Sequence, residues 1–341
     1  MRIIFITRSW HGIGGMQRLS KDLWRGISET YGDEAMLLHP YKEGITWLLP
    51  FAFRAFFRGM CADHIHLGDA SLAPLGVLIK RFSKARVTVT LCGLDTFYSA
   101  CWYQWLLRHS LPRLDHIVCI SGVLRDRAIK IGVSEDRITV IPCGVWPEDV
   151  RAISSHKKSD HPVIVTVGRL IPRKGVLWFL ENVLPELLKK MPTVEYRIIG
   201  DGPDIAAIRS VLLEKKLSHA VCIFSSASDA KRDHLLLSSN LMLVPNISVL
   251  GNGEGFGIVC IEAAVRGIPV VAARIEGLRD SVIEGKTGHF FESGNAQDCI
   301  AIIEEMMKQP LSTDVIRKTA IETYDWHTLF QRYDAIFSAM K

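Results

Sequence analysis

Residues 163–175 read Val163-Ile164-Val165-Thr166-Val167-Gly168-Arg169-Leu170-Ile171-Pro172-Arg173-Lys174-Gly175. The first five residues predict a short buried strand, because β-branched residues dominate the run. The loop that follows is bounded by glycines and carries three cations. Ligands of parallel sheets bind outside the carboxyl ends of the strands, where clustered cations suit a diphosphate. The alternative is a solvated basic loop without a ligand.

On both sides of this stretch, short apolar runs alternate with longer amphipathic segments. This alternation predicts an α/β fold with doubly wound parallel sheets that helices cover on both faces. Helix patterns include Gln17–Ser28, Leu72–Phe82 and Gly122–Ile131. The expected strands are Ile3–Thr7, Ala35–Leu38, His64–Leu67, Arg86–Leu91, His116–Ile120, Ile138–Ile141, Val163–Val167, Tyr196–Ile199, Val221–Phe224, Leu241–Val244 and Val270–Ala272.

The strand–helix pattern restarts in the middle of the chain, and 341 residues suit two domains of ordinary size. The break falls near Ile141–Val145, and the polar stretch Ser154–Asp160 is typical of a linker. We therefore expect one Rossmann-like domain over 1–145 and a second over 146–320. The final segment, Ala320–Lys341, predicts one helix whose apolar stripe must pack on another element. That stripe consists of Trp326, Leu329, Phe330, Tyr333 and Phe337.

The composition is that of a globular protein, with 48% hydrophobic and 23% charged residues. A net charge of +5 is too small for a nucleic-acid-binding face. Residues 1–150 hold +4 of this charge, which suits a mild attraction to an anionic membrane or a phosphorylated substrate.

Targeting and metal-binding signals are absent from the sequence. No apolar run reaches the roughly 18–20 residues of a membrane span, and the apolar start of the chain is too short for a signal peptide core. The eight cysteines show no zinc spacing, and several lie in apolar runs. We therefore expect reduced thiols in a cytoplasmic protein without a bound metal.

Two further glycine-rich segments are candidate binding sites. In Gly253–Ala264, Glu254 falls in a glycine loop, and Glu262 falls among apolar neighbours in the helix that follows. A carboxylate in such surroundings needs a partner, either sugar hydroxyls or an arginine. The turn Arg8–Gln17 opens a helix after the first strand and suits either a phosphate contact or a plain turn. It lacks the G-x-G-x-x-G spacing of a dinucleotide site, and no acid follows the next strand to hold a ribose.

The order and spacing of these motifs over about 160–292 resemble the GT-B retaining glycosyltransferases of family 4. The resemblance implies two Rossmann-like domains that face each other across a cleft, with 321–341 packing back on the first domain. The first half matches more loosely, through Gly14–Arg18, Val87–Asp95, Ile117–Ser121 and Ile141–Val145. The second half matches through Gly168-Arg169 with Lys174-Gly175, Gly200-Asp201-Gly202-Pro203, Glu254-Gly255-Phe256-Gly257 with Glu262-Ala263, Gly267–Ala272 and Gly285-Lys286-Thr287-Gly288.

The resemblance also implies how the donor would be held. Arg169 and Lys174 would bind its diphosphate, and Glu262 would hold its ribose hydroxyls. The only co-substrate implied is a nucleoside diphosphate sugar, with no further cofactor. No metal is implied, because the two cations take the place that a metal ion would have.

The transferred sugar would be held by other residues of the same motifs. By resemblance, Glu254 and the backbone of Phe256 and Gly257 would contact it. Gly14 and Gly15 would close over the donor from the first domain.

The sequence departs from the family pattern at Cys92, where a histidine that contacts the transferred sugar is usual. Three alternatives are open. Cys92 makes a weaker contact in an active enzyme, or Asp95 or His11 on the acceptor side takes over its role, or the site is inactive. The sequence places no base beside Cys92, so a nucleophilic thiol is not expected. Cys143 and Glu276 also replace residues that are usual in the family, asparagine and glycine.

Three other features allow two interpretations each. His64 and His66 share one face of a strand and suit either a metal or a structural or acceptor-side role. The segments 47–60 and 99–108 combine aromatic and aliphatic side chains with arginines. Each of these segments suits either a core helix or a peripheral membrane contact.

The resemblance implies transfer of a hexosyl unit from a UDP- or GDP-sugar to an acceptor hydroxyl, with retention of configuration. The acceptor would be a glycan or a lipid-linked glycan of a bacterial surface, made at the inner face of the membrane. The alternatives are a non-catalytic protein of the same fold that binds sugar nucleotides, and a sugar-nucleotide epimerase. Glu254, Glu262 and Lys174 argue against the epimerase.

Overall fold

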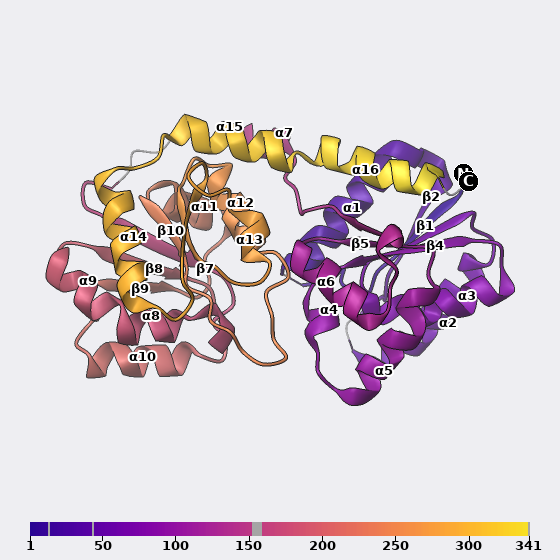
Figure 1. The fold of residues 1–341 in the computed structure, drawn as a ribbon, viewed down its shortest axis with the longest axis horizontal. Coiled ribbons are helices and arrows are strands. Elements are labelled where there is room, and N and C mark those ends of the chain that lie inside the picture. The colour runs from indigo at the N-terminus through magenta and orange to yellow at the C-terminus, as the bar shows by residue number, and fades with distance from the viewer. Residues whose placement is uncertain (13, 43, 152–158, 340–341) are drawn as a thin grey trace. The chain divides into compact units, whose positions relative to one another are not determined.

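The computed structural model describes residues 1–12, 14–42, 44–151 and 159–339. Over these residues the chain forms two six-stranded sheets, each with helices packed on it, as the alternating pattern predicts (Figure 1). The contacts divide the chain into two compact units. Unit 1 comprises Met1–Gly144, Glu254–Phe256 and Trp326–Lys341, and unit 2 comprises Val145–Gly253 and Gly257–Asp325. Most of the expected linker, residues 154–158, lies outside the described residues.

The sheet of unit 1 has the order β2-β1-β3-β4-β5-β6, and every pair of neighbouring strands is parallel. Its strands are β1 (Ile3–Ile6), β2 (Ala35–Leu38), β3 (His64–Leu67), β4 (Arg86–Leu91), β5 (His116–Cys119) and β6 (Ile138–Val140). Its helices are α1 (Gly15–Tyr31), α2 (Leu48–Gly59), α3 (Ala73–Phe82), α4 (Leu94–Phe97), α5 (Cys101–Ser110), α6 (Gly122–Ile131) and α16 (Trp326–Ala339).

The two faces of this sheet carry different helices (Figure 1). Side chains alternate along a strand, so Ile65 and Leu67 of β3 lie on the face against α2 and α3, next to Gly59 and Gly76. His64 and His66 point to the other face, which α16 covers. Helices α2 and α3 therefore lie on the opposite side of the sheet from α16.

His64 and His66 have a structural role under α16. The Nε2 atom of His64 lies 3.0 Å from Thr88 Oγ1, and the two ring nitrogens of His66 lie 2.8 Å and 2.9 Å from the hydroxyls of Thr88 and Thr90. Both rings pack on Phe337 of α16. Burial lowers the pKa of His64 to about 4 and that of His66 to about 3. Of the two interpretations from sequence, the structural one agrees with these contacts.

The sheet of unit 2 has the order β12-β11-β10-β7-β8-β9 and is also parallel throughout. Its strands are β7 (Val163–Val167), β8 (Glu195–Ile199), β9 (Val221–Phe224), β10 (Leu241–Val244), β11 (Val270–Ala273) and β12 (Gly288–Phe291). Its helices are α7 (Pro147–Arg151), α8 (Val176–Asn182), α9 (Leu184–Lys190), α10 (Ile205–Glu214), α11 (Asp229–Leu237), α12 (Ile258–Ala264), α13 (Leu278–Ser281), α14 (Ala296–Lys308) and α15 (Thr313–Tyr324).

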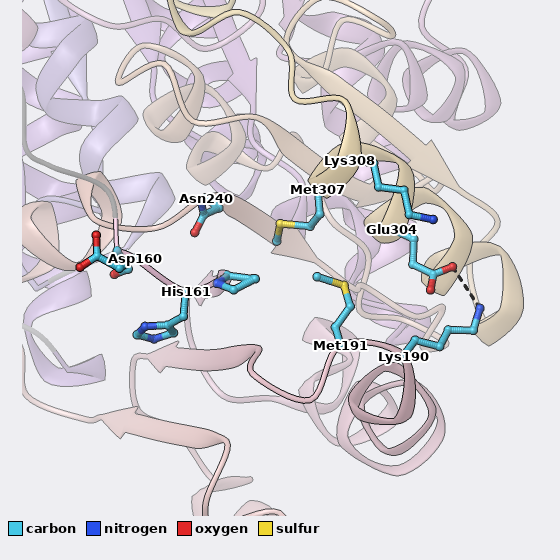
Figure 2. Close-up of a pocket in the computed structure, with 10 residues that line it drawn as sticks. Asp160, His161, Lys190, Met191, Asn240, Glu304, Met307 and Lys308 are labelled. Atoms are coloured by element: carbon cyan, nitrogen blue, oxygen red, sulfur yellow. Dashed lines mark hydrogen bonds and ion pairs between the residues drawn. The ribbon is translucent and has the colours of Figure 1, made fainter.

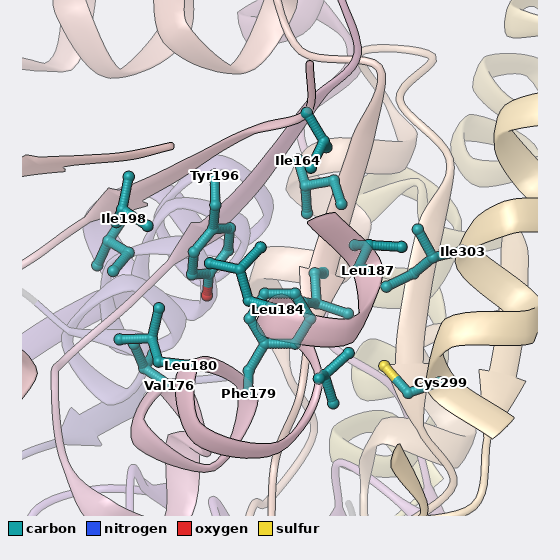
Figure 3. Close-up of a cluster of buried hydrophobic side chains, with 14 of the residues drawn as sticks. Ile164, Val176, Phe179, Leu180, Leu184, Leu187, Tyr196, Ile198, Cys299 and Ile303 are labelled. Carbon is teal, nitrogen blue, oxygen red and sulfur yellow. The ribbon is translucent and has the colours of Figure 1, made fainter. Parts of the chain in front are cut away.

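One face of the unit 2 sheet packs on α8, α9 and α14 (Figure 3). Ile164 and Tyr196, on β7 and β8, meet Phe179 of α8 in this core, with the rings of Phe179 and Tyr196 4.7 Å apart. The hydroxyl of Tyr196 is buried and donates to Thr166 Oγ1 at 2.9 Å, so the core holds no unsatisfied phenol.

The expected strands agree with the structure to within one residue at each end, but β12 was not expected. Only Phe290 and Phe291 are large apolar residues in this short edge strand. Its other signal is Gly288, where a Cβ would lie 2.0 Å from the carbonyl oxygen of Val270 on β11. Pairing with β11 therefore determines that this segment forms a strand, and the local sequence pattern does not reveal that pairing.

The single helix expected over Ala320–Lys341 is wrong. Two helices, α15 and α16, meet at Asp325, whose backbone is extended. The carbonyl of Tyr324 accepts a hydrogen bond from the Val145 backbone at 2.7 Å, which takes it out of the helical ladder. Helix α15 groups with unit 2 and α16 with unit 1. The stripe from Trp326 to Phe337 is buried as expected.

Candidate active site

The basic loop after β7 places two cations at the carboxyl end of the unit 2 sheet. Gly168 has a φ of +150°, and Arg169 next to it is exposed. Lys174 closes a short 3₁₀ turn, Pro172–Lys174. Its Cε lies 3.7 Å from the place that a Cβ on Gly168 would take, so its side chain runs back along the start of the loop. Arg169 and Lys174 therefore belong to one loop after β7, which is the position that the sequence pattern predicts for them.

The third cation of this loop, Arg173, has a different role. Its side chain is buried, and its Nε donates to Asn252 Oδ1 at 3.0 Å. Its carbonyl accepts the backbone N–H of Ile247 at 3.0 Å. Arg173 thus joins the loop after β7 to the segment that follows β10. The sequence alone could not separate this buried arginine from its exposed neighbour.

Backbone contacts through glycines bring three loops together at this edge. A Cβ on Gly200, after β8, would lie 1.9 Å from the carbonyl oxygen of Gly168. A Cβ on Gly175 would lie 1.7 Å from the carbonyl oxygen of Pro245, after β10. Because no side chain fits at such distances, only glycine allows the loops after β7, β8 and β10 to meet.

We expect Gly175→Ala to destabilise unit 2 by about 3 kcal/mol, because it adds a clash with Pro245 to the cost of a left-handed alanine. Gly175 has a φ of +65°. Gly285→Ala is the matched control, since Gly285 has a φ of +70° and no atom within 4 Å of its would-be Cβ. Urea denaturation measures both. Equal losses of about 1 kcal/mol would show that Pro245 yields without cost.

Glu262 lies on α12, which starts at the same edge of the sheet. Gly257 precedes this helix with a φ of +86°, and a Cβ there would lie 2.3 Å from Leu278 Cδ2. Cys260 and Ile261 turn into the core, whereas Glu262 is half-buried. Arg266 donates to the backbone carbonyl of Glu262 at 2.7 Å and to Asp233 at 2.9 Å. Arg266 is thus matched with the Asp233 carboxylate.

In unit 1 the glycine-rich turn runs from β1 into α1. Gly15 begins the helix, and Gly14 precedes it in an extended conformation. His11 lies in this turn, with its Nε2 3.0 Å from the carbonyl oxygen of Pro40. Its ring also packs edge-on against His39, at 5.2 Å between centroids. His11 therefore connects the turn after β1 to the segment after β2.

Asp95 is a buried carboxylate that holds two loops of unit 1 together. Its oxygens accept backbone N–H groups of Gly93 at 2.7 Å, Cys92 at 3.1 Å and Ala70 at 2.9 Å. Burial, and then the charge of Asp69, raises the pKa of Asp95 to about 6. Asp95 thus positions the loop after β4 against the segment after β3.

Cys92 is a buried neutral thiol. Its Sγ lies 3.2 Å from the carbonyl oxygen of Gly68, to which the thiol donates. Burial, followed by the charges of Asp95 and Asp69, raises the pKa of Cys92 well above its ordinary value. A raised pKa disfavours the thiolate that nucleophilic attack needs.

An ion pair that the sequence did not reveal lies beside Cys92. The buried carboxylate of Asp69, after β3, accepts from Arg8 Nε at 3.1 Å and from the Ser71 backbone at 3.0 Å. Arg8 lies two residues beyond the end of β1, which is the neighbour of β3 in the sheet. Knowledge of the strand order would have paired these residues, but strand order cannot be read from a local pattern.

Unit 1 also includes Glu254–Phe256, a segment far from Cys92 in the sequence. A Cβ on Gly255 would lie 2.2 Å from the carbonyl oxygen of Cys92, so glycine is required at this contact. Glu254 and Phe256 on either side of Gly255 are buried. The predicted sugar-contact residues Cys92, Glu254 and Phe256 thus lie in one packed region.

A hollow of about 430 Å³ lies at the opposite, amino-terminal edge of the unit 2 sheet (Figure 2). It is lined by residues that precede β7, β8 and β10, including His161, Met191 and Asn240, and by Glu304 and Met307 of α14. The site residues predicted from sequence do not line it.

In the described ranges of the chain, the helices are all too short or too polar to cross a bilayer. Nor does the described part contain three or more His, Cys, Asp or Glu side chains grouped as metal ligands.

Known families match both parts of the chain. A family model described as glycosyl transferases group 1 matches residues 150–323. A second, described as glycosyltransferase family 4, matches residues 28–149.

Curated relatives are similar at low identity. The chain is 24% identical to the phosphatidylinositol N-acetylglucosaminyltransferase GPI3 subunit of Saccharomyces cerevisiae, over 81% of this chain and 62% of that protein. It is 25% identical to the GDP-mannose-dependent alpha-(1-6)-phosphatidylinositol monomannoside mannosyltransferase of Mycolicibacterium smegmatis, over 80% and 75%. The chain thus spans less than two thirds of the length of the yeast relative.

Solved structures match the whole chain. The structure of Anabaena Alr3699/HepE in complex with UDP matches with a TM-score of 0.81 and 18% identity, over 99% of this chain and 100% of that one. The same protein has been solved with UDP-glucose. The apo form of the lipopolysaccharide outer core galactosyltransferase WaaB matches with a TM-score of 0.76, 18% identity and the same coverage. These likenesses establish the GT-B fold.

Proposed function

Since the chain belongs to the glycosyl transferases group 1 family, we propose that this GT-B glycosyltransferase moves a hexosyl unit from a nucleoside diphosphate sugar to an acceptor hydroxyl, with retention of configuration. One observation carries the donor part of the proposal. Arg169 and Lys174 rise together from the loop after β7, while Arg173 is used inside the protein. The two cations at the carboxyl edge suit the diphosphate of a donor.

Arg169 and Lys174 would act by stabilising charge. The bond from the anomeric carbon to the diphosphate breaks, a bond to the acceptor oxygen forms, and negative charge grows on the leaving diphosphate, which takes up the proton of the acceptor hydroxyl. Arg169 and Lys174 would stabilise that charge without a metal ion. Glu262, half-buried on α12, would accept hydrogen bonds from the ribose hydroxyls.

The transferred sugar would be held by the residues around Cys92. We propose that Glu254, with the backbone of Phe256 and Gly257, binds its hydroxyls. Gly14 and Gly15 would cover the donor, because a turn without side chains lets the backbone approach closely. Asp95 and His11 would act by positioning the loops that they join.

The acceptor that we propose is a glycan or a lipid-linked glycan of a bacterial surface, used at the inner face of the membrane. Two relatives whose names include phosphatidylinositol support a lipid-linked acceptor. The segments 47–60 and 99–108 would make the peripheral membrane contact.

A second candidate function is the binding of sugar nucleotides without catalysis. The observation that favours it is Cys92, whose thiol already donates to Gly68 and stands where the family's histidine contacts the sugar. Release of free nucleoside diphosphate together with a glycoside product would exclude this candidate and the epimerase as well. Binding without turnover on any acceptor would favour it.

The proposed donor site predicts a selective thermal shift. In a panel of UDP- and GDP-sugars, the true donor at about 100 times its Kd should stabilise the protein by about 2.7 kcal/mol, or roughly 5 °C in Tm. Lys174→Ala and Glu262→Ala should abolish the shift. The control Lys189→Ala removes an exposed cation of α9 and should keep it. A full shift in both site variants would refute the assignment.

A further inference from the structure

Helix α2 of unit 1 exposes a row of large apolar side chains. Leu49, Phe53 and Phe57 are 81%, 67% and 47% exposed. The rings of Phe53 and Phe57 pack on each other at 4.5 Å, so they form one continuous apolar ridge. The opposite side of the helix buries Phe51 and Ala55 in the core. The core-helix interpretation of 47–60 therefore accounts for only one face of α2.

Two neighbouring helices extend this ridge. Phe82 at the end of α3 is exposed and packs edge-on against Phe56 of α2, at 5.9 Å between centroids. Helix α3 in turn packs on α5, where Trp102 and Trp105 are 65% and 60% exposed. Figure 1 shows α2, α3 and α5 gathered on one side of the unit 1 sheet. We call the exposed faces of α2, α3 and α5 the three-helix surface.

The charge of the three-helix surface has a single sign. No aspartate or glutamate occurs in α2, α3 or α5, whereas Arg58, Arg81 and Arg108 are exposed on them. Helix α1, on the other face of the sheet, carries Asp22 and Glu29. Exposed aromatic side chains among cations without acids are typical of segments that lie in the headgroup region of an anionic membrane.

Next to α3, a basic hollow of about 510 Å³ is lined by Val77, Lys80 and Arg81 of this helix and by Arg113 of the turn that follows α5. Lys80 is held in place, because its Nζ donates to the Arg113 carbonyl at 3.0 Å and to Asp115 at 2.8 Å. The side chains of Arg81 and Arg113 are exposed at its rim. Asp115 balances the charge of Lys80, so Arg81 and Arg113 are the cations that the hollow offers to a phosphate headgroup, whose acyl chains remain in the bilayer.

We infer that the three-helix surface docks unit 1 on an anionic bilayer. The aromatic ridge of α2 and the tryptophans of α5 enter the headgroup layer, and the hollow between α3 and Arg113 binds an anionic phospholipid headgroup. The three helices carry no acids and are rich in exposed rings, and their charge and apolar character together favour anionic lipid over a protein partner. Docking would bring the protein to a lipid-linked acceptor, and only this purpose of the docking rests on the proposed function.

The test is co-sedimentation of the full chain with vesicles of phosphatidylcholine alone and with 30% phosphatidylglycerol. We expect binding to the anionic vesicles that high salt weakens, and little binding to the neutral ones. The double variant Phe53→Ser/Phe57→Ser should lose at least tenfold in partition coefficient. Both side chains are exposed, so the variant folds. Absence of wild-type binding to anionic vesicles would overturn the docking.

Two further variants sharpen the result. Arg81→Gln/Arg113→Gln should weaken anionic binding about fivefold for each cation removed. Leu213→Ser is the control, because Leu213 is 75% exposed on α10 of unit 2, and this variant should bind like wild type. An equal loss in Leu213→Ser would contradict a specific surface.

The donor thermal shift, measured on the same variants, separates docking from sugar transfer. It should be unchanged in Phe53→Ser/Phe57→Ser. Vesicle binding without any donor shift would keep the docking and overturn the proposed function. A donor shift without vesicle binding would keep the proposed function and overturn the docking.

Discussion

Replacing Lys174 by alanine is expected to lower kcat/KM for sugar transfer by about a thousandfold, which corresponds to about 4 kcal/mol of transition-state stabilisation. The cation binds the diphosphate of the donor already in the ground state and binds it more strongly as negative charge grows on the leaving diphosphate, so the loss should appear in both KM and kcat. Lys174 is half-buried, and its side chain runs along Gly168, which holds it in one place before the reaction. Arg169 is exposed and less restrained, so Arg169→Ala should cost less.

The measurement is donor turnover with the sugar nucleotide that gives the largest thermal shift. Lys189→Ala again serves as the control, since it removes an equal charge from an exposed position away from the loop. A Lys174→Ala enzyme within threefold of wild type would show that the diphosphate is held elsewhere. A loss confined to KM would assign Lys174 to ground-state binding alone.

Acidification is expected to destabilise unit 1 through the two buried histidines. Burial lowers the pKa of His64 to about 4 and that of His66 to about 3, against an ordinary value of 6.5. The folded state therefore favours the neutral rings, and their full contribution to the free energy of unfolding is present above pH 6.5. This contribution is lost as the pH falls below 6.5, because only the unfolded chain then binds the protons. By pH 5, each histidine lowers the free energy of unfolding by about 2 kcal/mol.

Asp95 opposes this effect. Its folded pKa is raised to about 6, so the folded state binds a proton below pH 6 that the unfolded chain takes up only near pH 4. This term grows more favourable as the pH falls and offsets part of the loss from one histidine. The histidine effect is therefore best measured as a difference between variants.

His66→Gln should flatten the pH dependence of the free energy of unfolding by about 1.4 kcal/mol per pH unit between pH 6 and 4. Urea denaturation at several pH values measures this pH dependence. Unfolding of unit 1 is followed by a short pulse of alkylation of the buried Cys119, which is always carried out at the same pH. His219→Gln is the control, because His219 is exposed. An unchanged slope in His66→Gln would mean that His66 is protonated in the folded protein.

The fold was largely predictable because its signals are local. A strand such as Val163–Val167 is recognised by its own β-branched residues, and the loop after it by its glycines. The buried stripe from Trp326 to Phe337 was likewise visible as a helical repeat. The break at Asp325 was not, since it depends on a hydrogen bond from Val145. β12 was missed for the same reason, because its partner strand lies elsewhere in the chain.

The sequence by itself determined which residue types follow each strand: cations and glycines after β7, and carboxylates in and after the Gly253 loop. Only the tertiary structure decided what each side chain does there. It turned Arg173 inward to Asn252 and left Arg169 exposed, although both belong to one loop. It also exposed the aromatic face of α2. The physical reason is that burial and pairing depend on neighbours that folding brings from distant positions, whereas periodicity and turn chemistry depend on adjacent residues.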